Sequence, residues 1–362
     1  MMNWTLVPAS DFASHAATWQ KLNQQGPAST LFELEFVQPL LAEFGTGKEL
    51  LVICTSQQAV VAMAIMAPSR TSAWETFQPS QAPIGMWMNM PGCDLDDLLN
   101  GLMRKLPGLP LVIGVTQRDP FLFPRPPDSA SLQTLDYIDT ARIQIEGSFD
   151  DYWAARGKNL RANLKKQRAR LVKEGYAVRM ETSRAPQQMA AAVADYGRLE
   201  SAGWKAQGGT AIHPDNKQGR FYRSMLEGFA RRGAASVIRY CLNDKVVAMN
   251  LCIEGNGSLI VLKTTYDETV PSHLSPAFLM REETCQQMFA EKKFSTLEFY
   301  GKVMEWHLRW TDEVRTLYHV NSYRWPILLR LHTILKNRQN RPLAQADAVP
   351  AEPNQLEKQP SE

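Results

Sequence analysis

The tetrapeptide Val-Val-Ala-Met occurs twice in the chain, at 60–63 and at 246–249. Each copy lies near the start of an apolar run typical of a β-strand, and each follows another such run that carries a cysteine, Cys54 or Cys241. The helices and strands expected around the two copies also follow the same order. Because 362 residues exceed what one hydrophobic core usually organises, this repetition predicts two related domains of mixed α and β structure.

Hydrophobic periodicity and turn residues divide the chain into elements. In the first part we expect helices at 11–24, 33–44 and 94–106, and strands at 49–56, 59–67, 71–78 and 109–117. In the second part we expect helices at 194–205, 216–233, 275–293 and 326–338, and strands at 235–243, 245–255, 258–267, 296–301 and 315–323. The pattern predicts an α/β (α+β) fold in which each domain has a mixed, mostly antiparallel sheet flanked by helices. We place the domains at 1–147 and 148–340. Residues 341–362, with four prolines and no aromatic residue, are expected to be a disordered tail.

The composition argues against several classes of protein. A formal net charge of +3 is too small to predict nucleic-acid binding from totals. The five cysteines are odd in number and form no CxxC pair, which favours buried reduced thiols over a disulfide framework or a zinc site. The N-terminus lacks the pattern of a signal peptide, and no apolar run approaches the ~20 residues of a membrane span. We therefore expect a cytoplasmic protein with no membrane span and no metal.

Strong positive charge marks the start of the second domain. Residues 149–174 are expected to form one basic interdomain helix, capped by Ser148 and Asp151 and ended by Gly175. It carries seven bases and no acid between 156 and 171: Arg156, Lys158, Arg161, Lys165, Lys166, Arg168 and Arg170. Its apolar stripe, expected to pack between the domains, consists of Tyr152, Trp153, Leu160, Leu164 and Leu171. The bases either form a solvated helix face or attract a polyanion such as a phosphate-rich cofactor or RNA.

An ordered set of motifs resembles the CelD-type acetyltransferase family of the GNAT superfamily, which is itself similar to the FemAB tandem-domain transferases. The motifs are FDDYWAARGKNLRANLKKQRARL, ESAGWKAQGGTAI, KVVAMNLCI, TTYDET, HLSPAFLM and LEFYGKVMEWHLRW. The resemblance covers roughly 30–335 and is most specific over 149–311. It implies two tandem GNAT-like domains, of which 1–147 is degenerate and 148–340 carries acetyltransferase activity.

The resemblance also implies a reaction. An acyl group, most simply acetyl, would pass from acetyl-CoA or another acyl-CoA to a small-molecule amine or amino-sugar acceptor, in polysaccharide or cell-envelope biosynthesis and without DNA. The pyrophosphate loop usual in the superfamily, (Q/R)xxGx(G/A), is missing, and Ser275-Pro276-Ala277 stands where relatives have Ser-Pro-Gly. Two alternatives therefore stay open. One is FemAB-like aminoacyl transfer from charged tRNA, and the other is an inactive scaffold that kept the fold.

Three residues are candidates for the chemistry. Alternation along an expected strand puts Glu298 and Tyr300 on one face and their apolar neighbours on the other. A carboxylate amid apolar neighbours has a raised pKa, so Glu298 is either a general base or an ion-paired strand residue. Tyr300 is the candidate donor of a proton to the leaving sulfur, and Tyr266, at the end of a central strand, is a further catalytic candidate.

The donor and the acceptor each have a predicted set of contacts. Ser275 and Pro276 open a helix whose free N–H groups suit a phosphate. The predicted donor site comprises Ser275, Pro276, Ala277, His273, Arg161 and Lys165. The predicted acceptor site comprises Trp204, Lys205, Trp306 and His307, where the aromatic rings either stack on a sugar or fill the core.

Overall fold

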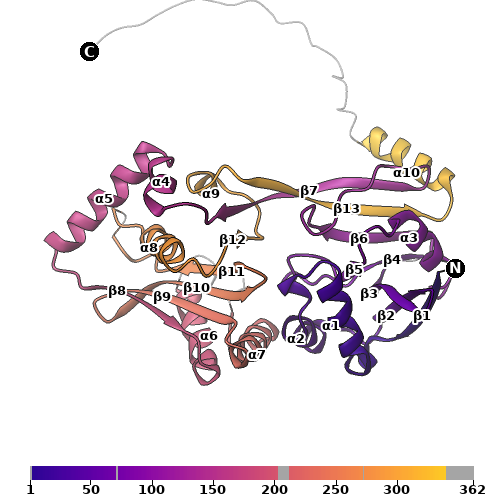
Figure 1. Cartoon of the computed structure of the whole chain (residues 1–362), viewed down its shortest axis with the longest axis horizontal. Helices are drawn as coiled ribbons and strands as arrows, with labels where there is room; N and C mark the ends of the chain where they lie inside the picture. Colours follow the sequence, from indigo (N-terminus) through magenta and orange to yellow (C-terminus); the bar gives the residue numbers. More distant parts are fainter. Residues whose placement is uncertain (1, 71, 203–211, 272, 340–362) are drawn as a thin grey trace, which may run out of the picture.

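A single mixed sheet runs through the whole molecule (Figure 1). The computed structural model describes residues 2–70, 72–202, 212–271 and 273–339. Within these residues the strand order is β1-β2-β3-β4-β6-β13-β7-β12-β11-β10-β9-β8, and β5 pairs with β3. The expected disordered tail lies outside the described residues.

The first half of the chain supplies one side of the sheet. Its strands are β1 (Asn3–Pro8), β2 (Leu50–Ser56), β3 (Ala59–Arg70), β4 (Ala73–Thr76), β5 (Trp87–Asn89), β6 (Val112–Arg118) and β7 (Leu132–Gln144). Its helices are η1 (Ala9–His15), α1 (Ala16–Gln25), η2 (Thr30–Phe32), α2 (Leu34–Phe44) and α3 (Leu95–Met103). The strands β1, β5 and β7 were not among the sequence expectations.

The second half supplies the other side. Its strands are β8 (Val178–Ser183), β9 (Ala235–Leu242), β10 (Lys245–Gly255), β11 (Ser258–Tyr266), β12 (Thr296–Phe299) and β13 (Val314–Tyr323). Its helices are α4 (Phe149–Ala154), α5 (Lys158–Lys173), α6 (Pro186–Ser201), α7 (Lys217–Arg231), α8 (Pro276–Glu291), α9 (Glu305–Leu308) and α10 (Pro326–Gln339). Apart from β8, each strand overlaps an expected one.

The two halves exchange strands at the centre of the sheet. The strand that follows β6 in the chain is β7, yet β6 pairs with β13 and β7 pairs with β12. The exchanged strands also pair with each other, antiparallel, from Val314 with Ala141 to Ser322 with Leu132. Figure 1 shows β7 and β13 as the long pair that bridges the halves. Each half of the sheet is therefore completed by a strand from the other half.

The repeated tetrapeptide occupies the same structural position in both halves. It lies in β3 and in β10, and in each case the strand pairs with the preceding cysteine-bearing strand. Val61 is bulged out between Val60 and Ala62, and Val247 is bulged out between Val246 and Ala248. Because a bulge at one position of a hairpin is a specific feature, its recurrence supports an internal duplication.

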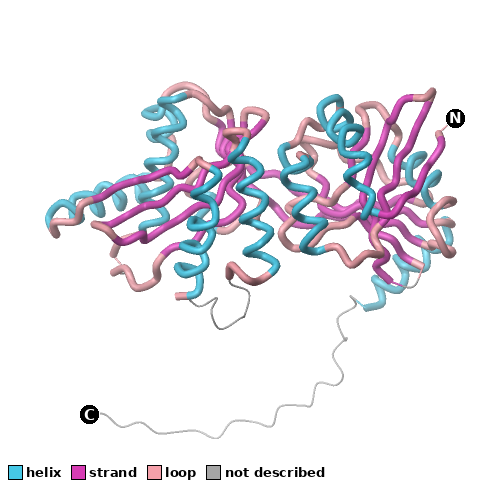
Figure 2. Tube along the Cα trace, turned by 90° about the horizontal axis from the view of Figure 1, so that it is seen from below, coloured by secondary structure: helices cyan, strands magenta, loops and turns pink. Residues whose placement is uncertain are grey.

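Helices cover both faces of the sheet. On one face α1, α2, α6 and α7 form a layer across both halves, joined by edge-on contacts of Phe221 with Phe36 and Phe44 (Figure 2). On the other face α3 covers the first half, whereas α4, α5 and α8 cover the second. The apolar side of α5, with Leu160, Leu164 and Leu171 buried, belongs to the core of the second half and not to an interdomain contact as expected.

The expected helix 149–174 is two helices. Ser148 accepts a hydrogen bond from the N–H of Asp151, as predicted, and starts α4. The chain then leaves helical geometry, and Gly157, with φ −53° and ψ 134°, is the N-cap of α5. Gly175 follows the end of α5 with φ +75°, a conformation that favours glycine. The break allows α4 and α5 to take different directions over α8.

Candidate active site

The pairing between the parallel strands β11 and β12 is short. They pair in parallel only from Ser258 with Thr296 to Val261 with Phe299. Beyond this point β11 continues to Tyr266 and keeps its pairing with β10 on its other edge. The ladder between β11 and β12 therefore ends at Val261 and Phe299, and among the described residues no other strand continues it along β11.

A bulge at Leu262 decides which side chains face α8. Leu251 pairs with Lys263 and Cys252 with Val261, which leaves Leu262 as the extra residue on β11. Because the extra residue reverses the alternation, Thr264 and Tyr266 then lie on the α8 face. The Thr264 hydroxyl is fixed there by donating to Asn250 Oδ1 at 2.7 Å.

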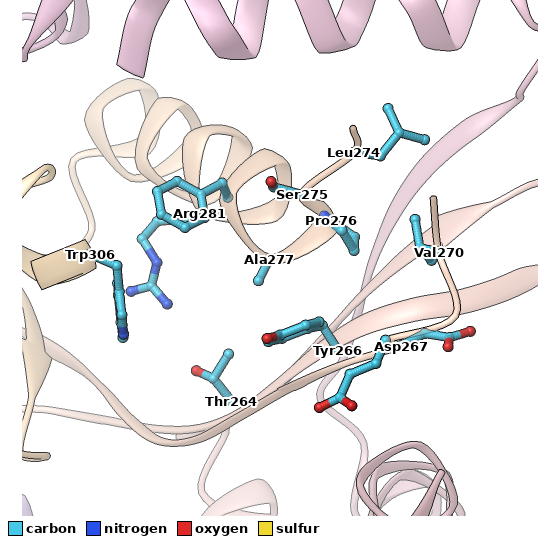
Figure 3. Close-up of a pocket in the computed structure, with 12 residues that line it drawn as sticks. Thr264, Tyr266, Asp267, Val270, Leu274, Ser275, Pro276, Ala277, Arg281 and Trp306 are labelled. Atoms are coloured by element: carbon cyan, nitrogen blue, oxygen red, sulfur yellow. The ribbon is translucent and has the colours of Figure 1, made fainter. Parts of the chain in front are cut away.

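A cavity of about 550 Å³ lies between the end of β11 and the start of α8 (Figure 3). It is lined by Thr264, Tyr266, Asp267, Glu268, Val270, Leu274, Ser275, Pro276, Ala277, Phe278, Arg281 and Trp306. A second depression, lined by the polar row Asn159, Asn163 and Gln167 on α5, shares Ser275 and Phe278 with it. The start of α8 thus lies between two adjoining hollows.

The first turn of α8 keeps one unused backbone donor. The Ser275 N–H donates to Gln167 Oε1 at 2.8 Å, and the Ser275 carbonyl accepts from the N–H groups of Phe278 and Leu279. Pro276 has no N–H. The Ala277 N–H has no partner among the described residues and lies in the wall of the cavity. Ser275 is the N-cap as expected, but its side chain makes no capping hydrogen bond.

Arg281 is the buried cation of the cavity. Its side chain extends from the second turn of α8 into the cavity beside Trp306 (Figure 3), and only 3% of the residue is exposed. Its Cζ lies 4.4 Å from the centre of the Phe299 ring and 4.8 Å from that of Trp306. Burial lowers the pKa of Arg281 to about 10, which leaves it protonated at neutral pH.

Asp267, an acid that lines the cavity, is paired within the protein. Asp267 pairs with Lys245 Nζ at 2.5 Å and accepts from the hydroxyl and N–H of Thr269. Burial opposes ionisation of Asp267, but these donors outweigh it and lower its pKa. The carboxylate is thus held by its own neighbours.

A buried ionic cluster lies on the opposite face of the sheet. Arg315 of β13 contacts both oxygens of Asp119 at 2.8–3.0 Å and lies 2.8 Å from Glu298 Oε2. Arg142 of β7 is 4.0 Å from Glu298 Oε1. Burial raises the pKa of Glu298, and the arginines only partly offset it. Burial and the nearby Asp119 raise the pKa of Tyr300 well above its usual value.

Comparison with known families and structures identifies this architecture. Residues 158–308 match the family model of an acetyltransferase (GNAT) domain. The C-terminal domain of a putative lysylphosphatidylglycerol synthetase from Agrobacterium fabrum superposes with a TM-score of 0.52 at 12% identity, covering 89% of this chain and 96% of that one. FemX superposes with a TM-score of 0.52 at 9% identity, covering 91% of this chain and 99% of that one. Residues 158–308 therefore have the fold of a GNAT domain.

A conserved protein of unknown function from Bacteroides thetaiotaomicron has the same fold, with a TM-score of 0.52 at 11% identity over 89% of this chain and 99% of that one. Comparison with curated protein sequences found no match. The chain is thus similar to an acetyltransferase (GNAT) domain over residues 158–308, and it shares its overall fold with these structures. Among the described residues no helix is long and apolar enough to cross a membrane, and no group of three or more His, Cys, Asp or Glu side chains forms a metal site.

The cavity at the start of α8 contains part of the predicted site. It is lined by five of the predicted residues: Tyr266, Ser275, Pro276, Ala277 and Trp306. Glu298 and Tyr300 lie on the other face of the sheet, as their alternation with the apolar residues predicted. His307 lies behind Trp306, stacked on its ring at 3.5 Å, and its Nδ1 accepts from the Met304 N–H. Burial and the nearby Arg281 lower the pKa of His307 to about 4, so it is neutral.

Other predicted residues lie elsewhere. His273 lies 3.6 Å from Glu174 at the end of α5 and does not line the cavity. Arg161 and Lys165 line a separate depression on α5 together with Trp153 and Gln286. Trp204 and Lys205 lie outside the described residues.

Sequence reasoning missed the residues that give the site its charge. Arg281 is the fourth residue after Ala277 in α8, so helical spacing places both on one face, and this was the available signal. Asp119, Arg142 and Arg315 carried no such signal, because the strand exchange brings them to Glu298 from distant parts of the chain.

Proposed function

We propose that the chain is an N-acyltransferase of the CelD type, which transfers an acyl group from acyl-CoA to a small-molecule amine or amino sugar. The observation that carries this proposal is the cavity at the start of α8, beside the part of β11 that continues past its pairing with β12. The donor would lie in this cavity, with a phosphate near the Ala277 N–H and its acyl end toward the opening between β11 and β12. The backbone of β11 beyond its pairing with β12 would hold the donor arm and the oxyanion.

The acceptor would approach from the opposite face of the sheet. There Glu298 is the candidate base, because its raised pKa suits proton transfer near neutral pH. As the amine nitrogen bonds to the thioester carbon, its proton passes to the Glu298 carboxylate. The carbon–sulfur bond then breaks, and the sulfur leaves with a proton from the Tyr266 hydroxyl, which lies in the donor cavity (Figure 3). Tyr300, which is beside Glu298, is the alternative proton donor.

The donor site is tested by blocking the cavity. Acetyl-CoA binding is measured by calorimetry on the full chain and on Ala277→Phe, which places a ring in the cavity wall. Ala290→Phe, at an exposed position near the other end of the same helix, is the matched control. We expect Ala277→Phe to abolish binding and Ala290→Phe to leave it unchanged. Failure of the native chain to bind CoA or any acyl-CoA would refute the proposal, and binding that instead requires charged tRNA and weakens steeply with salt would select the FemAB-like alternative.

The chemical role of Glu298 has a separate test. Glu298→Gln should lower kcat by about 10²–10⁴ with little change in KM, because general-base catalysis contributes this much. Glu305→Gln, an exposed acid at the start of α9, should have no effect. Unchanged turnover in Glu298→Gln would mean that Glu298 is not the base and only forms ion pairs in the buried cluster.

The proposed place of action is the cytoplasm, in polysaccharide or cell-envelope synthesis. This pathway and compartment are proposed from the CelD-type resemblance alone. The identity of the amine acceptor tests the proposed pathway. Amino sugars and their nucleotide derivatives are the first acceptors to assay with acetyl-CoA.

A further inference from the structure

Arg281 is a buried charge without a partner among the described residues. Only 3% of the residue is exposed to solvent. It forms no ion pair or hydrogen bond with any described residue. Its Nη1 is fully buried and has no acceptor. The two acids that follow it on α8, Glu282 and Glu283, are both taken by Arg168 of α5, at 2.5 and 2.9 Å. Its own helix therefore provides no counter-charge.

The described surroundings of Arg281 stabilise a cation but offer its donors no hydrogen-bond acceptor. The rings of Phe299 and Trp306 attract the guanidinium through their π faces. Neither ring accepts a strong hydrogen bond along the N–H directions. The other polar neighbours, Cys252, Cys285 and Tyr152, are neutral because burial raises their pKa values. A buried cation whose donors remain open is costly in the free protein, and an anion in the cavity would satisfy those donors.

The same cavity contains a second feature that attracts anions. The Ala277 N–H lies at the positive end of the α8 dipole, and Arg281 lies one turn further along the same helix face. Their positions differ by about 6 Å of helix rise. The Arg281 side chain extends away from the helix start, toward Phe299 of β12 and Trp306. A ligand whose phosphate lies at the helix start thus has Arg281 at its other end, beside the opening between β11 and β12.

We propose that Arg281 binds a carboxylate at the far end of the acyl group, so that the donor is the CoA thioester of a dicarboxylic acid and not acetyl-CoA. This inference rests on the proposed acyl-CoA function and names the acyl class of that site. The guanidinium can form a paired hydrogen bond with the terminal carboxylate, which acetyl lacks. The transferred bond is the same as before: the amine gains the acyl carbon, the thiol leaves, and the carboxylate stays unchanged on the product.

Binding of a series of thioesters tests the inference. The dissociation constants of CoA, acetyl-CoA, malonyl-CoA and succinyl-CoA are measured on the native chain, Arg281→Met and Arg281→Lys. We expect the native chain to bind an acidic thioester at least tenfold more tightly than acetyl-CoA. Arg281→Met should lose this preference while keeping its affinity for CoA, and Arg281→Lys should keep part of the preference. Arg309→Met, which removes an exposed arginine beside the second depression, is the control.

The stability of the variant separates binding from structure. If Arg281 exists to bind a ligand, Arg281→Met should melt at the same temperature as the native chain or higher, because it removes an uncompensated buried charge. A lower melting temperature without ligand would assign Arg281 a structural role and overturn the inference. Two binding results would also overturn it: equal affinity of the native chain for acetyl-CoA and the acidic thioesters, or equal weakening of CoA and succinyl-CoA in Arg281→Met. In both of these cases CoA still binds, so the proposed function stands.

Discussion

Glu298 is easier to protonate in the folded chain than in an unfolded one, because burial raises its pKa although Arg315 lies 2.8 Å away. A carboxyl group with a raised pKa binds more protons in the native state, so its contribution to stability is largest below the ordinary value of 4.5 and is lost as the pH rises. Each unit of pKa difference corresponds to about 1.4 kcal/mol.

This linkage predicts a pH-dependent difference between the native chain and Glu298→Gln. The free energy of unfolding of the native chain minus that of the variant should fall as the pH rises from about 4 through the folded pKa of Glu298. Urea unfolding at a series of pH values measures it, and other acids cancel because both chains share them. A difference that grows with pH would mean that Arg315 dominates and the pKa of Glu298 is lowered.

Periodicity was enough to place Glu298 but not to find its partners. The alternation of Leu297 and Phe299 with Glu298 and Tyr300 assigned each pair to its face of the sheet. Arg315, which pairs with Glu298, comes from β13. Arg315 also pairs with a second carboxylate, that of Asp119, which follows β6 in the other half. A pattern along one strand contains no information about which distant strand lies beside it. The chemistry of Glu298 therefore depends on contacts that only the fold supplies.

The same limit applies to whole elements. Most helices and strands were predictable, because their apolar residues recur at the spacing of a core-facing surface. The missed β7 mixes exposed and half-buried positions, since it crosses from one half to the other and has two different neighbours. The break between α4 and α5 was also missed, because Gly157 interrupts a run whose leucines otherwise keep helical spacing.

The ion pair between Arg315 of β13 and Asp119 at the end of β6 predicts that removing the Asp119 carboxylate strongly lowers the free energy of unfolding. Asp119→Ala would leave Arg315, only 4% exposed, with Glu298 as its remaining partner. Breaking a buried pair from one side costs about 3–5 kcal/mol. The matched exposed pair is Arg125 with Asp136, with side chains 39% and 70% exposed. Asp136→Ala should cost under about 1 kcal/mol in the same urea unfolding experiment, and equal costs for the two variants would contradict a buried role of Asp119.

Charge reversal on the basic side of α5 should weaken binding of the donor only slightly. Arg161 and Lys165 line a depression separate from the cavity at α8, and exposed charges are screened beyond about 8 Å at physiological salt. The double variant Arg161→Glu/Lys165→Glu should weaken donor binding by less than about threefold at this salt and more at low salt. Lys166→Glu/Lys173→Glu changes the charge of the same helix equally and is the control. A tenfold loss at physiological salt confined to the first variant would indicate direct contact with the donor.

At the scale of the whole molecule, the strand exchange links the two halves more firmly than a boundary at 147/148 suggests. The peptide before the boundary contains β7, which completes the sheet of the second half next to β12. The peptide after it contains β13, which completes the sheet of the first half next to β6. Either peptide alone would expose the edge of a central strand, which natural sheets avoid. The shared layer of α2 and α7 adds a further apolar contact between them.

Cutting the chain at this boundary should therefore not separate the halves. A protease site inserted between Glu146 and Gly147 follows the end of β7 and leaves the Ser148 cap of α4 intact. After cleavage the two peptides should elute together at the size of the uncut chain and melt in one cooperative transition, because both exchanged strands stay paired. The uncut insertion variant is the control for the insertion itself. Two peptides that separate on a sizing column without denaturant would show that the halves fold independently, as two domains joined only by the chain.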